Sequence, residues 1–212
     1  MKHKVEKLSG RSLMVSAAVA VAIFASSAAL AHGGLELQLA TGPDATRAKT
    51  IISKSGSFVL SRNLSVTAAG VDGVLITASN VTLDLQGYVI TGASGTANGI
   101  EVAAGLTNVT IVDGIITGFG GAGVLAGSDT ATNITGLTVQ GNGTGISCGI
   151  GSLVQGNIIQ GNLGEGLSFS DTTGGFLGNI LQGNDSNTSP GTTGQVNGGT
   201  SLGHNLCNGS AC

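Results

Sequence analysis

The tetrapeptide Ile158-Ile159-Gln160-Gly161 is one copy of a unit that recurs through most of the chain. Each copy has two mostly apolar residues, then Thr or Gln, then Gly. The other copies are Val89-Ile90-Thr91-Gly92, Ile115-Ile116-Thr117-Gly118, Thr138-Val139-Gln140-Gly141, Ile180-Leu181-Gln182-Gly183 and a divergent last copy, Leu206-Cys207-Asn208-Gly209. Successive Gly residues are 26, 23, 20, 22 and 26 positions apart. A period of this length indicates an architecture in which each copy is one structural unit.

Two further patterns repeat with a similar period. Gly followed by an aliphatic residue occurs at Gly73, Gly99, Gly123, Gly145 and Gly166, and Asn-aliphatic-Thr begins at Asn80, Asn108 and Asn133. Between these markers Val81, Leu83 and Leu85 alternate with polar residues, which is the period of a β-strand. No window has the pattern of an amphipathic helix, so helical repeats are excluded. The sequence therefore predicts an all-β fold, a parallel β-helix of about six to seven rungs with three short strands per rung.

Side chains at equivalent positions of such a fold stack in columns. One predicted inward column is Ile90, Ile116, Val139, Ile159, Leu181 and Cys207, and another is Val102, Ala126, Cys148 and Phe169. The Gly residues at the corners are expected to supply turns with positive φ. The Gln-Gly-Asn segments 140–142, 160–162 and 182–184 are expected to form amide ladders from rung to rung.

The N-terminal segment predicts export. Four basic residues precede an uncharged run from Ser12 to Ala31, which ends in the small-x-small pattern of a signal peptidase site. We interpret residues 1–31 as a signal peptide, residues 32–62 as an N-terminal cap with the strand Ser57–Leu60 that leads into the repeats, and residues 63–212 as the β-helix with a C-terminal capping rung. The alternative for the first segment is an uncleaved anchor; after cleavage we expect no membrane association, and a periplasmic or extracellular location. Residues 185–200 lack the period and predict a loop before the last rung.

A family resemblance rests on four segments: Gly56–Leu60, Asn80–Gly87, Asn108–Gly114 and the closing Asn205–Cys212. With them the chain resembles bacterial secreted proteins built from right-handed parallel β-helix repeats, the superfamily that contains pectate lyases and NosD-like periplasmic proteins. The resemblance implies a right-handed helix. It assigns no activity, because the shared motifs are structural.

Charge excludes several functions. The chain has 8 basic and 11 acidic residues, and no Lys or Arg follows Arg62. A nucleic-acid partner is therefore not expected, because the repeats have no cations to neutralise phosphates. A polyuronate lyase, the enzyme that the resemblance suggests first, is disfavoured because the repeats lack a basic side chain to abstract the proton.

Acidic residues are the remaining catalytic candidates. A glycoside hydrolase needs two carboxylates roughly 5–9.5 Å apart. Asp84 and Asp113 lie on neighbouring predicted rungs, with Glu101 between them in sequence, and strand parity directs Asp84 outward. The alternative is that these acids are solvated residues at strand edges and turns.

Metal and cofactor signals are weak, and we predict no resident cofactor. His32 would become the N-terminal residue after cleavage, where its amine and imidazole could chelate Cu(II). The other acids are too dispersed for a Ca²⁺ loop.

Three cysteines follow the predicted signal. We predict a disulfide between Cys207 and Cys212 that closes the last rung, with free thiols or a bond to another chain as alternatives. Cys148 falls in an inward column and is predicted to be a buried, inert thiol.

These observations favour a secreted or periplasmic β-helix that is not an enzyme and binds a neutral glycan or a cell-surface partner. The alternative is a polysaccharide hydrolase that uses Asp84 and Asp113.

Overall fold

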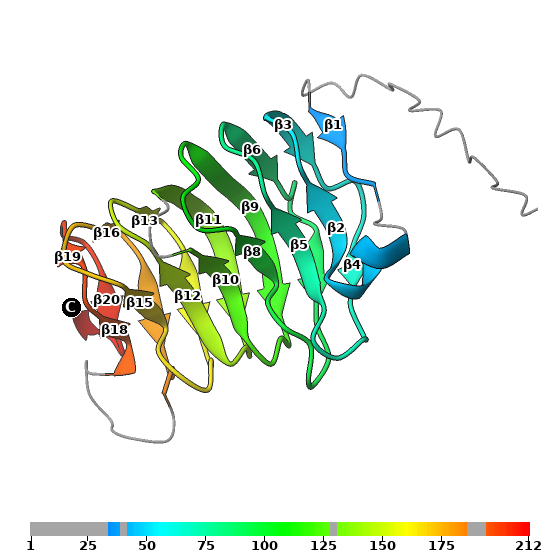
Figure 1. The fold of residues 1–212 in the computed structure, drawn as a ribbon. Helices are drawn as coiled ribbons and strands as arrows, with labels where there is room; N and C mark the ends of the chain where they lie inside the picture. Colours follow the sequence, from blue (N-terminus) through cyan, green and yellow to red (C-terminus); the bar gives the residue numbers. More distant parts are fainter. Residues whose placement is uncertain (1–33, 39–41, 128–130, 186–193) are drawn as a thin grey trace, which may run out of the picture.

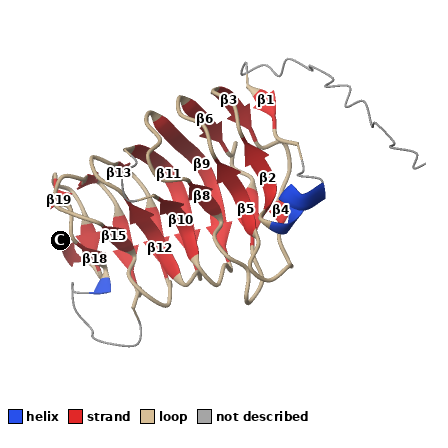
Figure 2. Cartoon of the chain, viewed as in Figure 1, coloured by secondary structure: helices blue, strands red, loops and turns tan. Residues whose placement is uncertain are grey.

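The computed structural model describes residues 34–38, 42–127, 131–185 and 194–212, which form a parallel β-solenoid of about seven turns (Figure 1). The predicted all-β class is therefore confirmed. A short 3₁₀ helix, η1 (Gly42–Thr46), lies near the first turn (Figure 2). The predicted signal peptide, residues 1–31, and His32 lie outside the described residues.

Each turn contributes strands to three faces. The first face consists of β3 (Gly56–Val59), β6 (Val81–Asp84), the first half of β9 (Val109–Thr117), the first half of β11 (Thr132–Gln140), β13 (Leu153–Gln155), β16 (Gly175–Leu177) and β19 (Thr200–Ser201), and β1 (Leu35–Glu36) pairs with β3. The second face consists of β4 (Leu64–Ser65), β7 (Val89–Thr91), the second halves of β9 and β11, β14 (Ile158–Gln160), β17 (Ile180–Gln182) and β20 (Leu206–Cys207). The third face is a seven-stranded sheet of β2 (Ala48–Ile52), β5 (Asp72–Ile76), β8 (Ile100–Val102), β10 (Ala122–Ala126), β12 (Thr144–Cys148), β15 (Leu167–Phe169) and β18 (Val196–Asn197).

The corner between the first and second faces is formed by left-handed residues. In β9 the chain turns at Asp113, with φ of 53°, and in β11 at Gly136, with φ of 68°. These two strands continue across the corner and carry both faces in one nine-residue strand. All these strands pair in parallel, whereas β20 and β21 (Ser210–Ala211) pair antiparallel as a terminal hairpin.

The core consists of stacked aliphatic columns. The predicted column from Ile90 to Cys207 is confirmed by the strand register, and Leu64 extends it by one turn. The predicted column from Val102 to Phe169 is also buried, on the third face. A third column lines the first face with Leu83, Ile111, Ile134, Val154 and Phe176. A narrow interior filled by three such columns leaves little room for aromatic rings.

The repeated Gly residues have two different structural roles. Those that end the tetrapeptide supply positive φ as predicted, for example Gly161 at 60°, with the exception of Gly92 in the first copy. Those that begin the Gly-aliphatic unit do not have positive φ. They are needed for space: a methyl group on Gly123 would lie 2.3 Å from Cγ1 of Val139 and 2.9 Å from the carbonyl oxygen of Gly145. The chain bends so sharply there that two successive residues, Gly123 and Val124, both face the interior.

A buried amide ladder runs along the corner between the second and third faces. Oδ1 of Asn162 accepts the backbone N–H and the Nδ2–H of Asn142, at 2.9 and 3.2 Å. Nδ2 of Asn162 also donates to the Val139 carbonyl, and the same bonds link it to Asn184. The Asn162 amide is therefore satisfied by two acceptor and two donor contacts. The ladder predicted for the Asn residues is confirmed, and outside it Gln160 donates to Gln140 at 2.9 Å.

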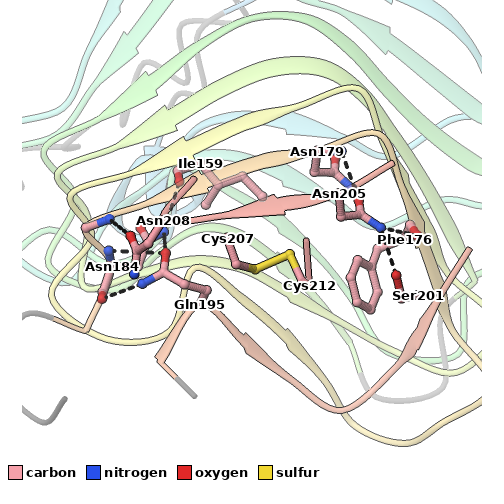
Figure 3. The surroundings of a disulfide bond; sticks show 11 residues. Ile159, Phe176, Asn179, Asn184, Gln195, Ser201, Asn205, Cys207, Asn208 and Cys212 are labelled. Atoms are coloured by element: carbon pink, nitrogen blue, oxygen red, sulfur yellow. Dashed lines mark hydrogen bonds between the residues drawn. A yellow bond between two sulfur atoms is a disulfide. The ribbon is translucent and has the colours of Figure 1, made fainter. Parts of the chain in front are cut away.

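A second buried ladder was not predicted. Asn157, Asn179 and Asn205 repeat the same bonds at the corner between the first and second faces. Each precedes a copy of the tetrapeptide, so the Asn-aliphatic spacing could have revealed it. Figure 3 shows how both ladders end in the last turn, one on Gln195 and the other on Ser201.

A disulfide lies between the ends of the two ladders. It joins Cys207 to Cys212, whose Cα atoms are 5.3 Å apart, within the terminal hairpin (Figure 3). Cys148 is a buried free thiol, as predicted, and burial raises its pKa to about 12.

The solenoid extends beyond the repeat that is visible in the sequence. β2, β3 and β4 pair in register with the second turn, so the first turn begins at Ala48, within the segment 32–62 that was interpreted as the cap. At the other end β18 and β19 pair with β15 and β16, so residues 194–201 belong to the last turn and are not a loop. The other residues of the predicted loop that are not placed, 186–193, lie outside the described residues. Within the described residues, no helix has the length and apolarity needed to cross a membrane.

The two roles of Gly predict different costs of substitution. Gly123→Ala should lower the free energy of unfolding by about 2–3 kcal/mol, because its methyl group overlaps Val139 and the backbone of the next turn. Gly156→Ala has open space around it and only the strain of φ 63°, and should cost about 1 kcal/mol. Urea denaturation of both variants measures the difference; equal costs would contradict the spatial role of Gly123.

The buried ladder predicts strong discrimination between Asn and Asp. Asn162→Asp replaces a double donor by an acceptor that faces Oδ1 of Asn184 and the carbonyl of Val139. It should destabilise the fold by about 3–5 kcal/mol at neutral pH, because it leaves a buried charge without a partner. Gln160→Glu makes the same charge change on the outside of the same turn and should cost less than about 1 kcal/mol. Thermal denaturation of the pair tests this, and equal melting temperatures would refute the ladder.

Candidate functional site

The candidate acids Asp84 and Asp113 line one open groove at the corner between the first and second faces. The groove has a volume of about 730 Å³. Its remaining lining residues come from three successive turns: Gln86, Gly87, Gly114, Ile115, Gly136 and Thr138. The groove therefore runs along the solenoid axis, across the strands.

Strand register and turn geometry together place the two carboxylates. Asp84 ends β6 and alternates with buried Leu83 and Leu85, so its side chain points outward, as predicted. Its register partner is Val112 rather than Asp113, so the two acids are offset by one residue. Oδ1 of Asp84 accepts the backbone N–H of Gln86 at 2.7 Å, which holds this carboxylate against the turn.

Asp113 is exposed at the corner itself. Its backbone has φ of 53°, a conformation that Asp tolerates better than most residues. A methyl group on Gly136 in the next turn would lie 2.6 Å from Oδ1 of Asp113. Gly136 therefore serves both the left-handed corner and the space that the Asp113 carboxylate occupies.

The groove is a row of hydrogen-bonding groups. The two carboxylates accept hydrogen bonds, whereas the Gln86 amide and the Thr138 hydroxyl can donate and accept. Asp113 is exposed and Asp84 is half-buried, so both carboxylates are in contact with solvent. The arrangement suits ligands that present many hydroxyl groups.

Glu101 does not lie with Asp84 and Asp113. It lies in β8 on the third face, where Asn98 and Asp72 are its neighbours. Its position between the two acids in sequence does not bring it near them, because each turn passes through all three faces. Nδ2 of Asn98 donates to Oε2 of Glu101 at 3.0 Å, and the backbone N–H of Asn98 donates to Oδ1 of Asp72 at 2.7 Å.

Asp72 is the residue with the most perturbed carboxyl in this cluster. Burial raises its pKa to about 6, the N–H of Asn98 opposes the increase, and the charge of Glu101 adds to it. Asn98 also accepts the N–H of Ala122 through Oδ1, at 2.9 Å, so this cluster links three turns. Sequence reasoning missed the cluster because Asp72 and Glu101 belong to different turns and share no motif.

A second pocket, of about 380 Å³, opens beside Glu101 on the third face. Its polar lining consists of Glu101, Ser147, Ser168 and Ser170, and its apolar lining includes Leu125 and Phe169. Glu101 is the one acid in its lining, whereas two acids line the groove.

The described residues contain no cluster of three or more His, Cys, Asp or Glu side chains that could hold a metal ion. His32, the residue named for copper, lies outside the described residues. The proposed copper site is therefore not placed by this structure.

The carboxyl cluster predicts how stability depends on pH. The folded chain keeps the Asp72 proton up to about pH 6, whereas the unfolded chain releases it near pH 4, so the wild-type protein loses stability as the pH rises through this window. Asp72→Asn retains an acceptor for the N–H of Asn98 and removes this loss. It should raise the free energy of unfolding by about 2–3 kcal/mol at pH 8 and leave it nearly unchanged at pH 3.

Chemical denaturation at the two pH values measures the effect of Asp72→Asn. Glu165→Gln, which neutralises an acid outside the cluster, is the control and should show no such difference. A destabilised Asp72→Asn variant at pH 8 would contradict the role of burial.

A scan against protein-family models, a search of curated proteins and a search of solved structures each found no match.

Proposed function

We propose that this protein is an exported, non-catalytic β-solenoid that binds a neutral glycan in the groove between its first and second faces. The observation that carries the proposal is the row of Asp84, Gln86, Asp113 and Thr138 across three turns of one groove. Carboxylate and amide oxygens accept hydrogen bonds from sugar hydroxyls, and such bonds are strengthened by the charge of the carboxylate. The same charge disfavours uronates and other anionic sugars, so a neutral chain fits best.

Binding is favoured over hydrolysis by the surroundings of the two acids. A glycosidase keeps one carboxyl protonated in apolar surroundings so that it can donate to the leaving group. Asp113 is exposed and Asp84 is tied to the N–H of Gln86, so neither has those surroundings. Hydrolysis by Asp84 and Asp113 remains the second candidate, because the two acids line the same groove.

Export and bacterial origin are part of the proposal. The basic and apolar segment 1–31 has the order of a signal peptide, and a disulfide such as Cys207–Cys212 persists in oxidising compartments. The resemblance to bacterial right-handed β-helix proteins related to pectate lyases supports a periplasmic or extracellular location. A cell-surface polysaccharide is then the ligand that the protein would meet, and a surface protein is the other partner considered.

A glycan array followed by calorimetry tests the groove as the binding site. We expect binding to neutral oligosaccharides, and a loss of about tenfold in affinity for Asp84→Asn or Asp113→Asn, because a neutral acceptor binds a hydroxyl less strongly than a carboxylate does. Glu165→Gln removes one acid outside the groove and should leave the affinity unchanged. Binding of uronates in preference to neutral chains would contradict the proposal.

A reducing-sugar assay on the bound glycans separates the two candidates. We expect no release of reducing ends by the wild-type protein. Turnover that is abolished by Asp84→Asn or Asp113→Asn would replace the binding function by hydrolysis.

A further inference from the structure

The second face carries an outward column of aliphatic side chains in its C-terminal half. Ile158, Ile180 and Leu206 pair directly with one another in β14, β17 and β20. Their exposed fractions are 41, 45 and 44%, while the inward residue next to each is buried. Inward aliphatic residues fill the core, but a solenoid has no internal need for an outward aliphatic column.

The surroundings of this column are polar but uncharged. Gln140, Gln160 and Gln182 form the neighbouring outward column, and the first two are hydrogen bonded to each other. The strands of the second face contain no Asp, Glu, Lys or Arg in any of the seven turns. The column is therefore apolar and lies on strands without charged residues, and at its N-terminal end it continues into Thr138 and Ile115 of the groove.

The charges on the rest of the solenoid restrict which partners can bind to the second face. Beyond Arg62 all charged residues are acids, and those that the structure describes lie on the first or third face, at the groove or in connecting segments: Asp72, Asp84, Glu101, Asp113, Glu165, Asp171 and Asp185. Two copies of this chain would repel each other through those regions. The second face is where they can approach without like charges opposing each other.

We propose that the second face is a self-association surface, on which two copies of this chain pack their Ile158, Ile180 and Leu206 columns against each other. Both copies have the same spacing of about 4.8 Å between side chains in a column, so the ridges of one fit between the ridges of the other. In a two-fold dimer the same patch faces itself, so the central residue, Ile180, lies opposite Ile180 of the second copy.

The size of the face sets the strength of the dimer. Two or three residues per strand and seven turns give a surface of roughly 10 by 30 Å. This is smaller than the area of about 800 Å² per partner in a standard interface. The dimer is therefore weak and depends on protein concentration, with a dissociation constant in the micromolar range or above.

Cross-linking through Ile180→Cys tests the geometry. Cys148 is buried and Cys207 is bonded to Cys212, so the introduced thiol is the reactive one among the described residues. Under mild oxidation we expect a disulfide-linked dimer on a non-reducing gel. Ser168→Cys places a thiol outward on the third face as the matched control and should stay largely monomeric. Equal dimer yields for the two variants, or none for Ile180→Cys, would overturn the proposal.

Sedimentation equilibrium of the purified protein, from about 10 μM to about 1 mM, tests the association itself. We expect a monomer–dimer equilibrium that Ile180→Glu weakens at least tenfold, because two carboxylates then face each other, while Ser168→Glu has no effect. Circular dichroism verifies that both variants are folded. A wild-type protein that is monomeric throughout would overturn the proposal, as would a face that binds a neutral glycan instead, detected as affinity lost in Ile180→Glu. Because the groove variants Asp84→Asn and Asp113→Asn leave this column intact, failure of the dimer and failure of glycan binding in the groove are distinguishable.

Discussion

Successive turns of this solenoid stack in register, and this stacking limits which residues each position can hold. Every residue in a turn has the equivalent residue of the next turn about 4.8 Å away. A column of like charges at this spacing repels itself, whereas aliphatic side chains attract and amides both donate and accept. The composition follows from this requirement: aliphatic residues inside, Asn and Gln in ladders, Gly where the chain bends, and charges only where a column is interrupted. Asp84, for example, stacks on Val112 and not on another acid.

The buried Asn ladders convert this constraint into a specific register. An Asn side chain inside a ladder donates to a backbone carbonyl of the preceding turn and to the Asn side chain of the following turn. The Asn162 amide, for example, donates to both Val139 and Asn184. A slip by one residue would leave every one of these amides unsatisfied in an apolar interior, at a cost of about 1–3 kcal/mol for each group. The aliphatic columns supply most of the burial, but they tolerate displacement because one aliphatic side chain resembles another. The ladders therefore fix which turn pairs with which.

Sequence reasoning succeeded where a column is uniform and failed where it is not. The Ile-Ile-Gln-Gly period predicted the solenoid, its two named columns and the Asn162 ladder, because a repeat in sequence is a stack in space. The first turn was not predicted, because Ala48–Ile52 pairs with β5 in register but does not contain a copy of the tetrapeptide. Glu101 was grouped with the wrong acids, because its neighbours Asp72 and Asn98 come from a face that sequence order does not reveal. The outward position of Asp84 was predictable from strand parity, whereas the left-handed corner at Asp113 was not.

Uniformity also separates structural from functional positions in this fold. Core packing accounts for an inward column that repeats one residue type. The outward column that contains Asp84 does not repeat. Val59, Asp84, Val112, Thr135 and Gln155 follow one another in it through the turns, and packing requires none of its polar members. The outward column of Ile158, Ile180 and Leu206 is the opposite case, because it is uniform and apolar although it faces solvent. Stacking permits this column but does not demand it, since outward Thr138 and Gln160 stack as well. Positions that depart from what stacking requires, in either direction, are therefore those for which we propose contact with a ligand or with a second copy of the chain.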